Sequence, residues 1–219
     1  MHKFCFGKLS NIVKTETYTN GRVCKTLENL TTMRVKHIIE VSVAYTDTVS
    51  HQPGHGGSKG IMNIVLNRID ERLIHGQVLI SWAKKLAVRQ IVIADDQSAE
   101  DPLAKTVLAL SVPMGIELKI LSCRDALDYL NAQPAGSYPN TILLMRSPQA
   151  MKYLWDNGYR PASINIGGMA AGASRSLLCR GVYMSEEERR ILRQLQNEGA
   201  EVYVQVVYAE AKTPLSKYL

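Results

Sequence analysis

The sequence predicts a doubly wound α/β fold, with a mostly parallel, open sheet and helices on both of its faces. From Met62 onward, short apolar runs alternate with longer stretches of helical character. This order of elements is typical of parallel strands joined by right-handed crossovers. The apolar runs show little polar alternation, which is expected for strands that are buried on both faces.

Six apolar runs predict the strands, and five intervening stretches predict the helices. The strands are expected at residues 63–67, 90–95, 116–121, 141–145, 163–166 and 201–207, and the helices at 76–87, 99–112, 123–132, 147–158 and 185–199. Ser147-Pro148 predicts an N-cap and first turn for a helix that Gly158 closes. Ser185 and Glu188 predict a capping box for a helix that ends at Gly199.

The first 61 residues differ in composition from the rest. They hold eight of the eleven threonines and both phenylalanines, but one alanine against seventeen downstream. No sustained helical or strand period runs through this leader, and it ends in the turn-rich HQPGHGGSKG. Either residues 1–61 are an appended hairpin or poorly structured arm, or translation truly starts at Met62. We favour the second interpretation, and expect residues 62–219 to form the α/β domain.

Composition excludes several classes of protein. No apolar run approaches the roughly 18 residues of a membrane span, and the start does not resemble a signal peptide, so we expect a cytoplasmic protein. The four cysteines are far apart, with no cysteine–histidine cluster, so no metal site is expected. The net charge is +6, but the leader holds 8 basic and 4 acidic residues, which leaves +2 for residues 62–219. We therefore expect no nucleic-acid partner.

Ligands of open parallel sheets bind at the carboxyl ends of the strands, in the loops that lead into helices. The predicted loops are 68–75, 95–101, 146–147 and 167–173, and the first is the longest and most charged. His75 closes this loop and is the only histidine after residue 61. The loop after the first strand is therefore the candidate site.

His75 would lie at the amino end of the predicted helix 76–87. The unpaired N–H groups and positive dipole there bind phosphate and disfavour imidazolium, so the ring would be neutral and nucleophilic. Arg72 and Arg68 could supply donors to phosphoryl oxygens, and Gly76 would let the backbone approach them. Asp70 could orient the imidazole by accepting its second N–H. Asp70 and Arg68 are also expected either to lie behind the groups that touch phosphate or to contact a partner. This arrangement predicts a carrier of a phosphoryl group.

Other residues complete the predicted site. Gln77, with the preceding glycine, would offer a helix-start N–H group, and Asn165, Gly167 and Gly168 would form the opposite wall. The alternative is that the histidine is structural and the charged loop merely solvated. From the residues alone, the imidazole nitrogen that would react also stays open.

The stretch NIVLNRIDERLIHGQV resembles the opening of the enzyme IIB component of the bacterial phosphoenolpyruvate-dependent sugar phosphotransferase system, mannose/fructose/sorbose family. The family motif R-[IL]-D-x-R-[LF]-[IL]-H-G-Q is matched without a break at residues 68–77. Later stretches, IVIADDQSAEDPLAKTVLALSVP, INIGGM and GAEVYVQVV, resemble its second strand and helix, its fifth-strand loop and its last strand. The likeness covers about residues 62–208.

The resemblance implies a protein-N(π)-phosphohistidine–sugar phosphotransferase. His75 would accept a phosphoryl group from phosphohistidine on enzyme IIA. It would pass that group to a sugar entering through the membrane subunits IIC and IID, which would hold the protein at the inner face of the membrane. No cofactor would be needed. A homodimer stays open, as does the identity of the sugar.

The sequence departs from the family pattern after INIGGM. There the family often has histidine or arginine followed by an aromatic, whereas this chain has Ala170-Ala171-Gly172-Ala173. The following residues 174–185 fit a strand. The departure motivates an alternative function, a phosphorylatable regulatory or binding module that keeps the fold without sugar transfer. A nucleotide-binding oxidoreductase is disfavoured, because no G-x-G-x-x-G follows the first strand.

Overall fold

The computed structural model describes residues 12–19, 22–29, 62–132 and 138–218, which fall in two units, Met1–His55 and Gly56–Leu219. In the first unit, β1 (Ile12–Thr19) and β2 (Arg22–Asn29) pair as an antiparallel hairpin. The rest of the leader, including the turn-rich HQPGHGGSKG, lies outside the described residues. That the leader is an appendage or a mis-called start stays a prediction, because a start codon is a property of the gene.

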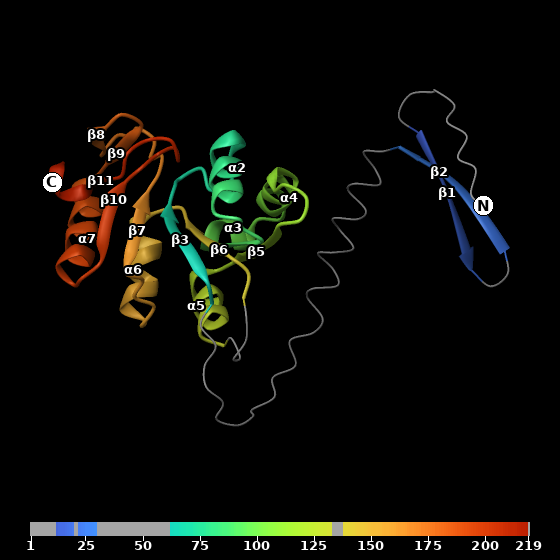
Figure 1. Ribbon diagram of the computed structural model, residues 1–219, viewed down its shortest axis with the longest axis horizontal. Coiled ribbons are helices and arrows are strands. Elements are labelled where there is room, and N and C mark those ends of the chain that lie inside the picture. The colour runs from blue at the N-terminus through green and yellow to red at the C-terminus, as the bar shows by residue number, and fades with distance from the viewer. Residues whose placement is uncertain (1–11, 20–21, 30–61, 133–137, 219) are drawn as a thin grey trace. The chain divides into compact units, whose positions relative to one another are not determined.

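The second unit is built on a seven-stranded sheet of order β11-β10-β7-β3-β6-β4-β5 (Figure 1). All neighbours in this sheet are parallel except β10 and β11. The strands are β3 (Ile64–Ile69), β4 (Gln90–Ala94), β5 (Glu117–Leu121), β6 (Thr141–Met145), β7 (Ser163–Ile166), β10 (Glu201–Val204) and β11 (Thr213–Pro214). The mostly parallel, open sheet is thereby confirmed.

Helices cover both faces of the sheet. One group of buried apolar residues joins the sheet to α5 (Cys123–Asn131), α6 (Pro148–Asp156) and α7 (Glu186–Asn197). A second group joins the opposite face to α2 (Gly76–Lys85) and α4 (Pro102–Ser111). Leu143 and Met145 of β6 belong to the first group, whereas Ile142 and Leu144 belong to the second. This alternation between two buried faces confirms the doubly wound architecture.

The first strand of the sheet, β3, lies at its centre. From β3 the chain runs to β4 and β5 at one side, returns to β6 beside β3, and then continues to β7 and β10 at the other side. The direction of winding therefore reverses next to β3. In such sheets the crevice outside the carboxyl ends of the strands at the reversal is the usual ligand site, and the charged loop after β3 lies there.

Local capping follows the sequence closely. The Ser147 side chain accepts a hydrogen bond from the Ala150 N–H, with a proline in the first turn of α6. Ser185 and Glu188 form the predicted capping box of α7. Residues 158 and 199, where the two helices were expected to end, are glycines with positive φ, the usual C-terminal signal.

Other elements differ from the predictions. The helix expected at residues 99–112 is two helices, α3 (Asp96–Glu100) and α4, because Asp101 caps α4 by accepting from the N–H groups of Leu103 and Ala104. The strand expected at 174–185 is a hairpin of β8 (Ser176–Cys179) and β9 (Val182–Met184). Neither β11 nor the 3₁₀ helix η1 (Leu215–Lys217) was predicted. β3 ends two residues later than predicted, so Arg68 belongs to the strand.

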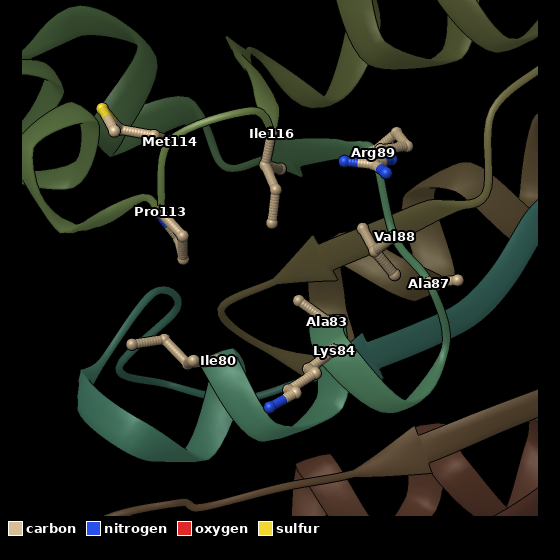
Figure 2. Close-up of a pocket in the computed structure, with 9 residues that line it drawn as sticks. All are labelled: Ile80, Ala83, Lys84, Ala87, Val88, Arg89, Pro113, Met114 and Ile116. Atoms are coloured by element: carbon tan, nitrogen blue, oxygen red, sulfur yellow. The ribbon is translucent and has the colours of Figure 1, made fainter.

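An open groove of about 360 Å³ lies between α2 and the segment that follows α4. Figure 2 shows the side chains around it, which come from residues 80–89 and 113–116. It contains none of the predicted site residues, so its walls belong to a different part of the surface. No helix among the described residues is long and apolar enough to cross a membrane.

Candidate active site

The loop between β3 and α2 is anchored to the two neighbouring strand ends. The Asp70 N–H donates to the Met145 carbonyl at the end of β6 (2.9 Å), and the Glu71 N–H donates to the Gly168 carbonyl after β7 (3.0 Å). Within the loop, the Leu73 N–H donates to the Asp70 carbonyl (2.9 Å). Leu73 has φ +53°, an unfavourable backbone conformation for a residue with a side chain. The loop is thus a tight turn fixed from both sides.

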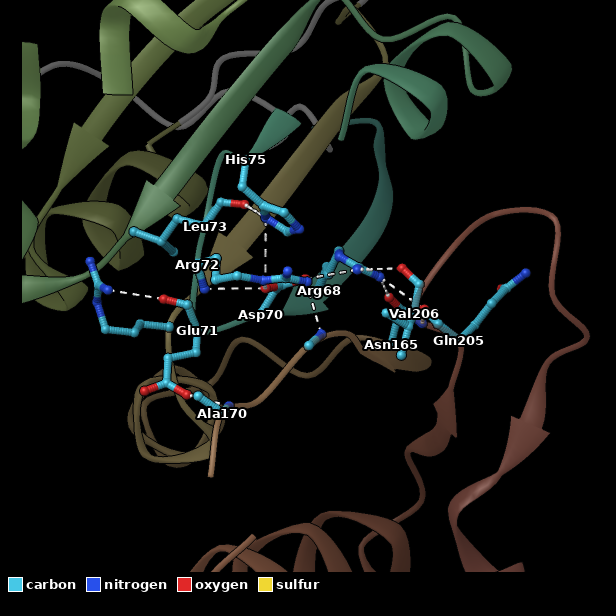
Figure 3. A network of polar contacts seen from close by, with 12 residues as sticks. Arg68, Asp70, Glu71, Arg72, Leu73, His75, Asn165, Ala170, Gln205 and Val206 are labelled. Atoms are coloured by element: carbon cyan, nitrogen blue, oxygen red, sulfur yellow. Dashed lines mark hydrogen bonds and ion pairs between the residues drawn. The ribbon is translucent and has the colours of Figure 1, made fainter. Parts of the chain in front are cut away.

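Arg68 lies buried beneath the exposed residues of the site, and Figure 3 shows its polar contacts. Its side chain is 2% exposed and donates to the Asp70 carboxylate at 2.8 Å. It also donates to the Asn165 side chain and to the carbonyls of Gln205 (3.0 Å) and Val206 (2.8 Å). Four acceptors occupy the guanidinium, so it has no free edge for a phosphoryl group. Of the roles predicted for Arg68, direct contact with phosphate or a partner is therefore wrong because the group is internal, whereas a position behind the exposed groups of the site agrees with the structure.

Asp70 connects the buried Arg68 to the exposed part of the loop. Its carboxylate is fully buried. Oδ2 accepts from Arg68 and from the Gly168 N–H (3.1 Å), and Oδ1 accepts from the Arg72 N–H (3.2 Å). The Arg72 Nε lies 3.6 Å from Oδ1. Asp70 therefore positions Arg72 and neutralises Arg68, and since its carboxylate is fully buried it lies behind the exposed groups and does not contact a partner.

The two predicted glycines of the opposite wall lie directly against these charged groups. A Cβ at Gly167 would lie 2.5 Å from the Arg68 Nη2 and from the Asp70 Oδ2, and a Cβ at Gly168 would lie 2.5 Å from the Arg72 Nη2. Any larger residue would collide with the charged side chains. The structure thus places both glycines against the charged loop, and Asn165 bonds to the buried Arg68.

His75 is the N-cap residue of α2, and the helix begins with Gly76 and Gln77. Gly76 has φ +43° and open space around the position of a Cβ, so here glycine meets a backbone requirement and not a close contact. His75 Nδ1 lies 3.2 Å from the Leu73 carbonyl and 3.9 Å from the Asp70 Oδ1. The prediction that Asp70 accepts the imidazole N–H is therefore wrong. Asp70 lies beyond hydrogen-bond distance, and the nearer Leu73 carbonyl is the partner of Nδ1.

The pKa of His75 lies below its ordinary value. Burial is the main cause, and the positive charges of Arg72 and Arg68 act in the same direction, whereas Asp70 and the Leu73 carbonyl oppose them. A lower pKa favours the neutral ring, in the predicted direction, although the predicted cause was the helix terminus. The His75 Nε2 is buried and has no hydrogen-bond partner among the described residues.

Arg72 is the exposed cation of the site. Its side chain is 54% exposed, whereas Arg68 and Asp70 below it are buried. Its guanidinium lies against the backbone of Gly168, and Arg72 precedes His75 in the same loop by three residues. Among the described residues no group of acidic, cysteine and histidine side chains could hold a metal ion.

Comparison with known proteins identifies the family. The protein-family model for the sorbose subfamily IIB component of the phosphotransferase system (PTS) matches residues 64–219. The chain belongs to this IIB family.

Relatives and solved structures agree with this assignment. The chain is 31% identical to the PTS system mannose-specific EIIAB component of Escherichia coli (strain K12), over 71% of this chain and 48% of that protein. It thus spans about half the length of that relative. It is 29% identical to the PTS system sorbose-specific EIIB component of Klebsiella pneumoniae, over 68% of this chain and 90% of that one.

Two solved structures share the fold. The crystal structure of manxB from Thermoanaerobacter tengcongensis has a TM-score of 0.67 and 31% identity, over 72% of this chain and 95% of that one. The IIBSor domain of the sorbose permease from Klebsiella pneumoniae has a TM-score of 0.68 and 27% identity, over 72% and 96%.

In this IIB chain, three contacts that support the site were not predicted, and they come from Arg146, Arg175 and Gln205. Arg146 donates to the Glu71 carbonyl (2.9 Å) and pairs with Asp95 (3.1 Å), which links the loop to the end of β4. The Glu71 side chain binds Arg175 on the loop after β7. Gln205 offers only its main-chain carbonyl to the site arginine. Arg146 could have been found from its place directly after a strand, but no sequence pattern marks the others.

Proposed function

We propose that this protein is a PTS IIB phosphocarrier. His75 accepts a phosphoryl group from phosphohistidine on an enzyme IIA and transfers it to a sugar that enters through IIC and IID subunits, at the cytoplasmic face of the membrane. The observation that carries this proposal is a partly exposed histidine of lowered pKa at a helix N-cap, beside the exposed Arg72. Burial and the neighbouring cations favour its neutral form, which has the lone pair that attack on phosphorus requires.

The charge balance of the site suits this chemistry. Asp70 would repel a phosphoryl dianion, but its carboxylate is paired with Arg68 at 2.8 Å. Arg72 therefore supplies the net positive charge, and its guanidinium can bind phosphoryl oxygens with two parallel N–H groups. The N–H groups of Gly76 and Gln77, at the start of α2, add donors and the positive end of the helix dipole.

The transfer needs no external acid or base. The lone pair of a neutral His75 nitrogen forms the new N–P bond as the bond to the donor histidine breaks, and each ring keeps the proton on its other nitrogen. Arg72 would stabilise the charge on the equatorial oxygens while phosphorus lies between the two rings.

The orientation of the ring makes a specific demand. The contact of Nδ1 with the Leu73 carbonyl requires a proton on Nδ1, because a carbonyl only accepts. Phosphorylation at N(π), which is Nδ1, therefore requires the ring to leave this carbonyl and to carry its proton on Nε2. Nitrogen-15 NMR of the phosphorylated protein would identify the nitrogen, and phosphorus on Nε2 would contradict the N(π) assignment.

The decisive experiment is transfer of labelled phosphate from phosphoenolpyruvate, through the general PTS proteins and a IIA, onto the chain. The His75→Ala variant should take up no label, whereas a control with His2, His37, His51 and His55 replaced by glutamine should take up as much as the parent. The label should be labile in acid and stable in alkali. An unlabelled parent, with a competent IIA present, would refute the proposal.

A second function is motivated by the small residues of the loop after β7, Ala170-Ala171-Gly172-Ala173. A phosphorylatable regulatory or binding module would take up label at His75 without passing it on. Membranes that contain IIC and IID separate the two, because a carrier loses its label to a sugar such as mannose, sorbose, fructose or N-acetylgalactosamine, and a regulatory module does not.

A further inference from the structure

The loop after β7 is tied to the active-site loop through one carboxylate. The Glu71 Oε2 accepts hydrogen bonds from the Ala170 N–H (2.7 Å) and from the Arg175 guanidinium (2.8 Å). Figure 3 shows Glu71 reaching from the active-site loop to Ala170. Between these two donors, residues 171–174 are only alanine, glycine and serine. Met169 anchors the start of the loop in the core, but beyond it Arg175 is the first long side chain that can hold the loop in position.

The other side of Arg175 is held by helix α7. Its Nη2 and Nε donate to the two carboxylate oxygens of Glu188 at 2.7 and 3.1 Å. Glu188 is itself nearly buried, with a side chain 4% exposed, and accepts from the Ser185 N–H in the capping box. A forked, two-bond pair to such a fixed partner leaves the guanidinium little freedom. Both carboxylates also raise the pKa of Arg175.

We infer that Arg175 is a positioning residue for phosphoryl transfer, which holds Glu71 and thereby the active-site loop against α7. The inference rests on the proposed function. Glu71 stands between Asp70 and Arg72 in the chain, so release of its side chain loosens the segment that leads to His75. A misplacement of about 1 Å in such groups lowers a transfer rate by roughly a hundredfold.

A nearby arginine provides a matched control. Arg189 lies on α7, the helix that also carries Glu188. Its side chain is 10% exposed and binds Ser176 of β8 and Glu186. It has a burial similar to that of Arg175, whose side chain is 19% exposed, but none of its contacts reaches the active-site loop. A purely structural role for Arg175 predicts that loss of either arginine has similar consequences.

The experiment compares Arg175→Met, Arg175→Lys and Arg189→Met in the full-length chain. Three quantities are measured: the maximal rate of labelling from phospho-IIA, the KM for phospho-IIA, and the midpoint of thermal unfolding. We expect Arg175→Met to lower the maximal rate roughly ten- to a hundredfold, and Arg175→Lys to restore part of it. Arg189→Met should lower the midpoint while leaving the rate unchanged. Equal rates in the two methionine variants would overturn the inference.

A second readout does not depend on labelling. Amide hydrogen exchange of the unphosphorylated protein should show faster exchange of the Glu71 and Ala170 N–H groups in Arg175→Met, and no change there in Arg189→Met. Unchanged protection in both variants would overturn the positioning role even if the parent protein is labelled. If the parent takes up no label while Arg175→Met loses protection, the proposed function fails and the structural link between the two loops stands.

Discussion

Adjacent glycines after β7 offer a sharp separation between stability and phosphoryl transfer. Gly167 and Gly168 have neither a positive φ nor room for a side chain, so alanine at either position tests packing alone. An added methyl group would meet different neighbours at the two positions. At Gly167 it collides with the buried pair Arg68–Asp70, and at Gly168 with the exposed guanidinium of Arg72.

For Gly167→Ala, the new Cβ lies 2.5 Å from both partners of the buried ion pair and 2.6 Å from the Arg68 Cζ. Ordinary contact begins at 3.4 Å, so these atoms must separate by almost 1 Å. Arg68 is held by four acceptors and cannot move without breaking bonds. Separating a buried ion pair costs about 3–5 kcal/mol, which corresponds to a fall of about 6–20 °C in Tm for a domain of this size.

For Gly168→Ala, the collision is with the end of a flexible side chain that can swing into solvent. The free energy of unfolding should change by no more than about 0.5 kcal/mol. The displaced Arg72 guanidinium should lower the rate of labelling of His75 about tenfold or more. Thermal unfolding and labelling from phospho-IIA check both variants. A stable Gly167→Ala, or a Gly168→Ala with the parent's rate, would refute the packing argument or the role of Arg72 respectively.

Three further outcomes follow from the site and its helices. Arg72→Met should raise the pKa of His75, because the positive charge of Arg72 lowers it; an NMR titration that shows no rise contradicts this. The lowered pKa of His75 keeps the ring neutral down to the ordinary histidine pKa of about 6.5. The rate of phosphoryl acceptance should therefore stay constant as the pH falls to that value and decline only below it. A decline centred above that pH contradicts the lowered pKa. Ser185→Ala should destabilise the protein by about 1 kcal/mol in denaturant unfolding, through loss of the cap of α7, and an unchanged midpoint contradicts the cap.

Strands and helix caps were predictable because their signals are local. β6 and β7 have the predicted bounds, since each is a continuous apolar run between turn residues. The prediction of one helix at 99–112 missed the break at Asp101, although an aspartate before Pro102 is itself an N-cap signal. The hairpin of β8 and β9 escaped prediction because its strands of four and three residues carry too short a pattern to show a turn between them.

The site was predictable only in part, for a related reason. Its position and its exposed residues, His75 and Arg72, follow from the motif and from the end of β3. The burial of Arg68 does not, because it depends on carbonyl groups at the end of β10, more than 130 residues away in the sequence. A main-chain carbonyl leaves no trace in residue identity, so the sequence could not distinguish an internal arginine from one that binds phosphate.

The buried arginine also ties the active-site motif to the second half of the sheet. The Arg68 guanidinium lies 5.2 Å from the ring centre of Trp82 in α2, and Trp82 meets Tyr208 edge-on at 5.1 Å. The helix that begins at His75 is thus packed on a cation whose partners come from the ends of β7 and β10. These strands join β3 on the side opposite β6. The loop and helix that carry His75 are therefore packed on groups from the second half of the sheet, although every residue of the motif lies in the first half.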